Sequence, residues 1–367
     1  MNDMSSLRER LATTERRGAP IRVMIVDDSA TARAVFSRII KREEDMVLAA
    51  VACTAEEGLE ALRQTQVDVI LLDLEMPGMG GLDALPRMIA AVPGVRIMVV
   101  STLTVQGAEP TLAALSLGAA DTLAKPQAGG FDDDYRERLI RKIRALGRTA
   151  IRAARLALAA QAVRTPVAPT RRAARHPAAV VAIGASTGGI HALGQLFNAM
   201  PRRIGMPILV TQHLPASFMD ALARQLQAAS GREALVATEG ALLVPDRILI
   251  APGDAHLMVV KRGTDLFVKL DRRSVPTGCL PAVDPMFASL AEALGGQVLG
   301  IVLSGMGRDG TEGARRIVEA GGTIFAQDEP SSAVWGMPGS VSRAGLATTI
   351  LSPAELGGRI ASAVTPA

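Results

Sequence analysis

A serine in a glycine-rich segment is the first candidate for covalent chemistry. Ser186 lies within residues 184–189, Gly-Ala-Ser-Thr-Gly-Gly, between an apolar run that predicts a strand and a helix predicted to begin near Ile190. Glycines allow a sharp turn and close approach of a substrate, and free amides at a helix start favour negative charge. The spacing fits the Gly-x-Ser-x-Gly pattern of serine nucleophiles. A phosphate-binding loop is the alternative, but no Walker lysine and no suitably spaced ribose-binding acid accompany it.

A serine hydroxyl needs a base to take its proton, and the sequence offers four histidines. His213 ends the strongly apolar run 208–212, so we expect it at the same sheet rim as the serine. His176 lies in a linker, and His191 is expected to be exposed on the helix after the glycines. His256 follows a Pro-Gly-Asp turn, where a bond from its side chain to the backbone is expected. His213 is the predicted base.

The base in turn needs an acid that orients its ring and stabilises its charged form. Asp309 lies in a second glycine-rich segment, residues 304–310, directly after an apolar run. Asp254 and Asp284 compete, but one follows a turn and the other precedes a proline, which is typical of turn capping. Asp309 is the predicted acid. The chain order Ser, His, Asp differs from that of α/β-hydrolases, so that fold is not expected.

These loops resemble the catalytic domain of CheB, the chemotaxis protein-glutamate methylesterase family. The resemblance includes Thr-Gln-His-Leu-Pro at 211–215, Ala-Pro-Gly-Asp at 251–254 and Gly-Met-Pro at 336–338. Two positions depart from the family pattern. Arg308 stands where an asparagine is usual, and Leu-Pro-Ala at 280–282 replaces Arg-Pro-Ser. Both changes are expected near the substrate face, where they concern the choice of partner rather than the chemistry.

The resemblance implies a set of roles in the second half of the chain. Ser186, His213 and Asp309 would form the catalytic triad, and the backbone amide of Met306 would help to form the oxyanion hole. The substrates would be methylated glutamates on chemoreceptor helices. Deamidation of receptor glutamines would be a second activity.

A cluster of acids is expected in the first half of the chain. Asp27 and Asp28 follow one predicted strand directly and Asp73 follows another, so all three should lie at one rim of a parallel sheet. Such carboxylates repel one another unless a hard cation such as Mg²⁺ joins them. Ser101 and Lys125 end the next two strands and add a hydroxyl and an ammonium. The set suits a carboxylate that accepts a phosphoryl group.

This ordered set resembles the response-regulator receiver domain. The matching residues are the Asp-Asp pair, Leu-Asp followed by Glu-Met-Pro at 75–77, the serine and the Lys-Pro pair. The resemblance implies that Asp73 is phosphorylated. The other implied roles are Mg²⁺ ligation by Asp28, Asp73 and the backbone carbonyl of Glu75, an outer-shell acid at Asp27, a switch hydroxyl at Ser101 and a phosphate contact at Lys125.

Two positions of this segment depart from the receiver pattern. Thr122 stands where receivers carry an aromatic switch residue, and Gly80 stands where an aspartate is common. The resemblance also implies that the unphosphorylated receiver covers the hydrolase cleft and that phosphorylation opens it.

The elements that must position these residues follow from alternating apolar runs and helical patterns. In the first half, strands are expected at 21–26, 67–72, 97–100 and 120–124, and a basic helix at 131–158. In the second half, strands are expected at 179–183, 207–212, 247–251, 256–261, 266–270, 298–303 and 322–326. This pattern predicts two doubly wound α/β domains, a five-stranded parallel receiver sheet and a larger, mostly parallel hydrolase sheet. The expected boundaries are an extension at 1–19, a receiver at 20–135, a basic helix and linker at 136–177 and a catalytic domain at 178–367.

Composition limits the remaining classes of function. A length of 367 residues exceeds what one core usually supports, and aromatics at 2% disfavour stacking platforms for single-stranded nucleic acid. Residues 136–175 hold twelve Arg or Lys and one acid, which indicates a solvated helix and linker more than a nucleic-acid surface. No signal peptide or apolar span is evident, so a cytoplasmic protein is expected. Cys53 and Cys279 are expected to be small buried residues, not a disulfide or zinc site.

Together these features predict a phosphorylation-regulated carboxylic-ester hydrolase of two-component signalling and chemotaxis adaptation. Mg²⁺ is expected for the receiver and no cofactor for ester hydrolysis. The expected partners are a histidine kinase or other phosphodonor and methylated chemoreceptor helices, without nucleic acid or membrane insertion. A phospho-gated methylesterase of a non-chemotaxis protein and a non-catalytic phospho-gated binding module are the alternatives. The sequence does not identify the receptors, the kinase or the oligomeric state.

Overall fold

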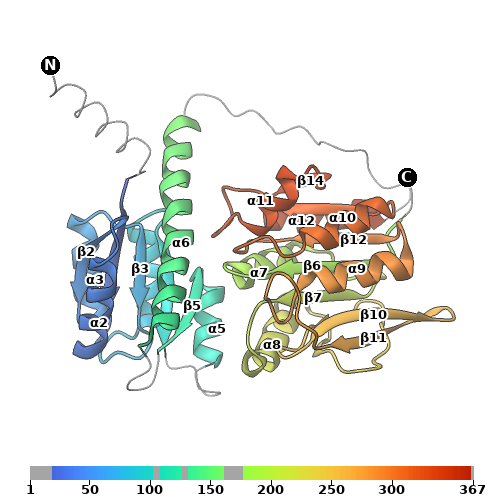
Figure 1. Ribbon diagram of the computed structural model, residues 1–367, viewed down its shortest axis with the longest axis horizontal. Helices are drawn as coiled ribbons and strands as arrows, with labels where there is room; N and C mark the ends of the chain where they lie inside the picture. The colour runs from blue at the N-terminus through green and yellow to red at the C-terminus, as the bar shows by residue number, and fades with distance from the viewer. Residues whose placement is uncertain (1–18, 102–107, 126–130, 161–176, 365–367) are drawn as a thin grey trace. The chain divides into compact units, whose positions relative to one another are not determined.

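The computed structural model describes residues 19–101, 108–125, 131–160 and 177–364. These residues form two compact units, each built on its own sheet (Figure 1). The predicted fold class is confirmed, with a five-stranded sheet and a larger seven-stranded parallel sheet. Most of the expected N-terminal extension and linker, with His176, lies outside the described residues, and the expected domain boundaries stay predictions. Within the described ranges, no helix is both long enough and apolar enough to cross a membrane.

The first sheet has the strand order β2-β1-β3-β4-β5. Strand β1 pairs in parallel with β2 and with β3, and β3 pairs in parallel with β4. The central strands are nearly continuous apolar runs, because helices cover both faces of a sheet of this kind. The elements are β1 (Ile21–Val26), α2 (Ala30–Lys41), β2 (Met46–Ala52), α3 (Ala55–Gln64), β3 (Val69–Leu72), α4 (Gly81–Ala91), β4 (Arg96–Ser101), α5 (Ala108–Ser116) and β5 (Asp121–Ala124).

A long basic helix, α6 (Asp133–Ala160), follows the first sheet, where the sequence predicts one. Its apolar side is fully buried at Leu139, Ile143 and Leu146. On its other side, Arg144 donates hydrogen bonds to Asp45 and Glu43, each at 2.8 Å. Part of the positive charge is therefore balanced within the unit, as expected for a solvated structural helix.

The second sheet has the order β14-β13-β12-β6-β7-β9-β8, and all of its pairs are parallel. From β6 the chain first builds β7, β9 and β8 on one side and later β12, β13 and β14 on the other. Strand β6 is thus a topological switch point, where α/β sheets bind ligands beyond the carboxyl ends of the strands. The strands are β6 (Val180–Ala185), β7 (Ile208–Gln212), β8 (Ala234–Val236), β9 (Ile248–Ile250), β12 (Val298–Val302), β13 (Thr323–Gln327) and β14 (Thr349–Leu351).

Alternate residues of these strands point into one continuous apolar core. Val180, Ala182 and Val302 of the sheet pack with fully buried residues of helix α9, such as Phe287 and Leu290. Helices α9 and α10 pack on each other, and α7 packs with α12 and α8. The helices are α7 (Gly189–Ala199), η1 (Ala216–Phe218), α8 (Met219–Ser230), α9 (Val283–Leu294), α10 (Thr311–Glu319), α11 (Met337–Arg343) and α12 (Pro353–Val364).

Two strands expected in the second unit form a separate antiparallel hairpin. Strands β10 (His256–Arg262) and β11 (Asp265–Asp271) pair with each other outside the main sheet (Figure 1). Three further strands, β2, β8 and β14, were not predicted from the sequence. Each lies at the edge of its sheet and is only partly buried, so it lacks the continuous apolar run of the central strands.

Candidate active site

Ser186 directly follows the switch-point strand β6. Its backbone amide donates to Ser304 O at 3.0 Å, and the Gln212 side chain donates to Ser186 O at 3.0 Å. Ser186 is therefore attached to the ends of both neighbouring strands, β12 and β7. Helix α7 begins at Gly189, close to the predicted start.

The two glycine-rich segments meet at this serine. A Cβ atom on Gly305 would lie 2.9 Å from Ser186 Cβ, so only glycine allows the loop after β12 to approach this closely. Gly188, the residue before α7, has a φ of 76°, a left-handed conformation that suits glycine. The spacing of glycines that indicated a nucleophile loop thus corresponds to real steric requirements.

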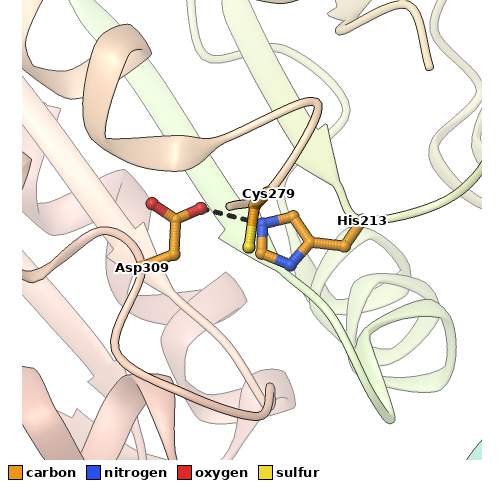
Figure 2. Close-up of side chains that lie close together, drawn as sticks. All are labelled: His213, Cys279 and Asp309. Carbon is orange, nitrogen blue, oxygen red and sulfur yellow. Dashed lines mark hydrogen bonds and ion pairs between the residues drawn. The ribbon is translucent and has the colours of Figure 1, made fainter. Parts of the chain in front are cut away.

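The structure brings His213 and Asp309 together, as predicted. His213 follows β7 and Asp309 lies in the loop after β12, and Nε2 of the imidazole lies 2.8 Å from Oδ2 of the carboxylate (Figure 2). Since a carboxylate can only accept, Nε2 carries the proton and Nδ1 is the nitrogen left to act as a base. The His213 amide donates to Ala185 O at 3.1 Å, which holds the histidine beside the end of β6.

Three backbone amides hold the Asp309 carboxylate in place. Oδ2 accepts from Val283 N at 2.7 Å, and Oδ1 accepts from Gly310 N at 2.9 Å and from Asp284 N at 3.2 Å. Burial raises the pKa of this carboxyl, but the hydrogen bond from His213 and those from the amides outweigh burial and lower it. Asp309 is therefore a fixed negative charge facing the imidazole.

The imidazole responds to that charge. Burial lowers the pKa of His213, but the hydrogen bond to Asp309 and the adjacent Cys279 sulfur outweigh burial and raise it from 6.5 to about 9. The side chain keeps 15% of its surface exposed, so water and substrate can reach it. A strongly basic imidazole accepts a proton readily once it is neutral.

The hydroxyl of Ser186 is not engaged by the base in this structure. Among the described residues, no hydrogen bond joins Ser186 Oγ to His213, although residue 185 of β6 lies opposite residue 212 of β7 in the sheet register. Such bonds are often long before a substrate binds. Met306 lies next to Gly305 and is partly buried, and its amide as an oxyanion donor stays a prediction.

Among the described residues, the rejected alternatives make no hydrogen bond to the imidazole of His213. His256 is buried, accepts from Ala282 N at 3.0 Å and has Nε2 2.8 Å from Arg273 O, which confirms the expected side-chain to backbone bonds. His191 is partly buried rather than exposed. Asp254 pairs with Arg272 at 3.0 Å on the surface. Asp284 accepts from a helix amide, and burial together with the Asp309 charge raises its pKa to about 6.

The two cysteines are free, as expected, but the expectation that they are buried is wrong. Both are only partly buried, and Cys279 lies in a cluster with His213 and Asp309 whose ligand atoms are all within 4.8 Å of one another (Figure 2). The cysteine is 66 residues from the histidine in sequence, so local patterns do not reveal this proximity. The one available signal was its place directly before residues 280–282, which the resemblance put near the substrate face.

The acids of the first unit form the predicted cluster. One ligand atom from each of Asp27, Asp28 and Asp73 lies within 4.8 Å of the others. Lys125 Nζ lies 2.8 Å from Asp27 Oδ2 and 2.5 Å from Asp73 Oδ2. Burial raises the pKa of Asp73, with Lys125 acting in the opposite direction. Burial lowers the pKa of Lys125, but its two carboxylate partners outweigh burial and raise it.

This donor set fits a hard cation. Two of the three acids are buried and Asp28 is exposed, so a Mg²⁺ ion could reach the cluster from solvent and keep several waters. Ser101, at the end of β4, is buried, and its carbonyl accepts from the Lys125 amide at 2.8 Å. The Glu75 amide donates to Asp73 Oδ1 at 3.2 Å, and its carbonyl as a metal ligand stays a prediction.

Comparisons with known proteins find a known family for each half of the chain. Residues 181–360 match the family model for CheB methylesterase, and residues 23–130 match that for the response regulator receiver domain.

The protein-glutamate methylesterase/protein-glutamine glutaminase 2 of Caulobacter vibrioides is 45% identical over 345 residues, covering 93% of this chain and 98% of that protein. A similarly named protein of Paramagnetospirillum magneticum is 40% identical over 360 residues, covering 92% and 94%. The crystal structure of the Thermotoga maritima CheB methylesterase catalytic domain aligns with a TM-score of 0.49 and 33% identity, covering 51% of this chain and 99% of that one. The extent and identity of the full-length matches show that the chain belongs to the CheB family of response-regulator methylesterases.

Proposed function

We propose that this protein hydrolyses methyl esters on glutamate side chains of chemoreceptors, releasing methanol, under the control of phosphorylation at Asp73. The observation that supports the chemistry best is the hydrogen bond between His213 and Asp309 at the rim where Ser186 lies. The names of the full-length relatives support the substrate class.

In the proposed mechanism, Ser186 Oγ attacks the ester carbonyl while Nδ1 of His213 takes its proton. The tetrahedral intermediate collapses, and the methoxide leaves as methanol with the proton that His213 returns. A water molecule, activated by the same nitrogen, then hydrolyses the acyl-enzyme to free glutamate. Asp309 keeps the imidazole in the required tautomer and stabilises its charged form.

The oxyanion would form beside the loop after β12. A Cβ atom on Gly305 would lie 2.9 Å from Ser186 Cβ, and this close approach supports the following amide, that of Met306, as the donor to the developing charge. The same acyl-enzyme would form from a glutamine side chain, with ammonia as the leaving group. Glutaminase activity therefore belongs to the same proposal.

The proposal for the receiver assigns the phosphoryl acceptor to Asp73 and the donor to a histidine kinase or a small phosphodonor. Asp28, Asp73 and the Glu75 carbonyl would hold Mg²⁺, which neutralises charge on the phosphoryl group when bound. Lys125 contacts Asp73 already and would contact the phosphoryl oxygens. Asp27 supports the ammonium from the other side.

The test is methanol release from methylated receptors by the full-length protein. Ser186→Ala should lower the turnover number by several orders of magnitude, because triad members act as a unit. Ser274→Ala, an exposed serine of the loop that carries Cys279, is the matched control and should retain activity. If Ser186→Ala kept more than about a tenth of wild-type turnover, the serine mechanism would be wrong.

A further inference from the structure

A cluster of metal-binding groups lies within the proposed active site. His213, Cys279 and Asp309 each offer one ligand atom, and these atoms lie within 4.8 Å of one another. Imidazole nitrogen, thiolate sulfur and carboxylate oxygen are the three ligand types that proteins use for zinc. The proposed hydrolysis needs the histidine and the aspartate but has no role for the thiol.

The backbone holds each of the three side chains from a different element. Asp309 accepts three amide hydrogen bonds, so its carboxylate cannot turn away. His213 is attached to the end of β6 by its own amide. Cys279 lies in a loop, 272–281, that the buried His256 ring ties at both ends, through Arg273 O and Ala282 N. The thiol position is therefore a property of the fold rather than of a free loop.

The spacing of the ligand atoms suits a small tetrahedral ion. Zinc lies about 2.0–2.3 Å from nitrogen, oxygen and sulfur ligands, which puts neighbouring ligands roughly 3.3–3.8 Å apart. Nε2 and Oδ2 are now 2.8 Å apart because they share a proton. If that proton is removed and the distance between Nε2 and Oδ2 increases by about half an ångström, the two atoms reach the spacing that zinc requires. Figure 2 shows the sulfur beside the same imidazole and the carboxylate facing the ring.

We infer that His213 Nε2, Cys279 Sγ and Asp309 Oδ2 form a binding site for Zn²⁺ whose occupation blocks ester hydrolysis. The amides of Val283, Asp284 and Gly310 would support the carboxylate from outside the site. The thiolate and imidazole favour zinc over Mg²⁺, which prefers oxygen ligands. The acidic cluster of the receiver offers only oxygen ligands, so it favours Mg²⁺ over zinc.

Zinc binding and catalysis exclude each other at this site. The ion takes Nε2 and Oδ2, so His213 loses the hydrogen bond that sets its tautomer, and the thiol and Nε2 must give up their protons. Affinity should therefore fall as pH falls. The inference that zinc binds depends only on the geometry of the three side chains. The inference that zinc inhibits hydrolysis also depends on the triad proposed above.

The experiment measures methanol release by the full-length enzyme at fixed pH over a range of buffered free Zn²⁺, each variant normalised to its own rate in chelator. Wild type should be inhibited, and chelator should restore it. Cys279→Ala and Cys279→Ser should need at least about tenfold more free zinc for the same inhibition. Cys53→Ala, which removes the other cysteine, should behave as wild type, and Mg²⁺ should not inhibit.

Direct binding separates the two parts of the inference. Competition for Zn²⁺ with a chromophoric chelator should show one site that disappears in Cys279→Ala and in Asp309→Ala but persists in Cys53→Ala. Equal zinc affinity in wild type and both Cys279 variants would overturn the site. Zinc that binds at this site without inhibiting would support the site and contradict the proposed triad instead.

Discussion

At the scale of single residues, the chemistry proposed for the second unit depends on how strongly His213 holds a proton. The nearby Asp309 carboxylate and Cys279 sulfur favour the imidazolium form, which cannot act as a base. Asp309 and His213 were predictable from the sequence, because each follows an apolar run that ends at the same rim of the sheet. The sulfur was not, because its proximity depends on a loop fixed by His256 far from the motif.

The pH profile of hydrolysis should therefore be alkaline. Because the pKa of His213 is raised to about 9, the neutral imidazole is a minor species at lower pH, and kcat/KM should rise about tenfold per pH unit until the pH approaches that value. Cys279→Ala removes one cause of the raised pKa of His213, so the rise in kcat/KM should shift to lower pH. The measurement is kcat/KM for methanol release from pH 6 to 10. A wild-type profile that levels off near 6.5, the ordinary pKa of histidine, would contradict this assignment.

At the scale of elements, three adjacent parallel strands position the site. Ser186, His213 and Asp309 follow β6, β7 and β12, the central strands around the switch point. These strands are predictable because burial on both faces makes them continuous apolar runs. The edge strands β2, β8 and β14 are not, because their pattern is set by pairing with a neighbour that sequence does not reveal.

The loop between β6 and α7 offers a test at this scale. Gly188→Ala would place a Cβ against Ala333 and Ser304 at a φ of 76°, so it should destabilise the second unit by more than about 2 kcal/mol. Gly194→Ala is the matched control in helix α7, where a Cβ would meet nothing within 4 Å and should stabilise by roughly 0.5–1 kcal/mol. Urea unfolding followed by the fluorescence of Trp335, the one tryptophan of the sequence, reports on this unit. Equal unfolding midpoints for the two variants would refute the steric argument.

At the scale of the whole molecule, the protein joins two sheets of the same construction with different chemistry at their rims. One rim holds three acids and a lysine, and the other holds a serine, a histidine and an aspartate. Both groups of residues were predictable from the sequence. The rim of a sheet lies where its parallel strands end, whichever residues follow the strands. How a change at one rim alters the other depends on the relation between the units, which local patterns do not specify. Regulation therefore has to be measured on the intact chain.

Phosphorylation at Asp73 should raise methanol release by the full-length enzyme. A small phosphodonor with Mg²⁺ adds negative charge beside Lys125, and a shift of about 1.4 kcal/mol in the equilibrium between inactive and active forms would already change their ratio tenfold. Asp73→Asn should be neither labelled nor activated, while Asp83→Asn, an exposed acid of α4, should respond as wild type. A fragment beginning near residue 178 should exceed the unphosphorylated full-length rate if the receiver inhibits by covering the cleft. Thr122 stands in place of the usual aromatic switch residue, so the size of the activation shows how well the receiver switches without that side chain. Equal rates with and without the phosphodonor, in a wild-type protein shown to be labelled, would mean that phosphorylation at Asp73 does not control hydrolysis.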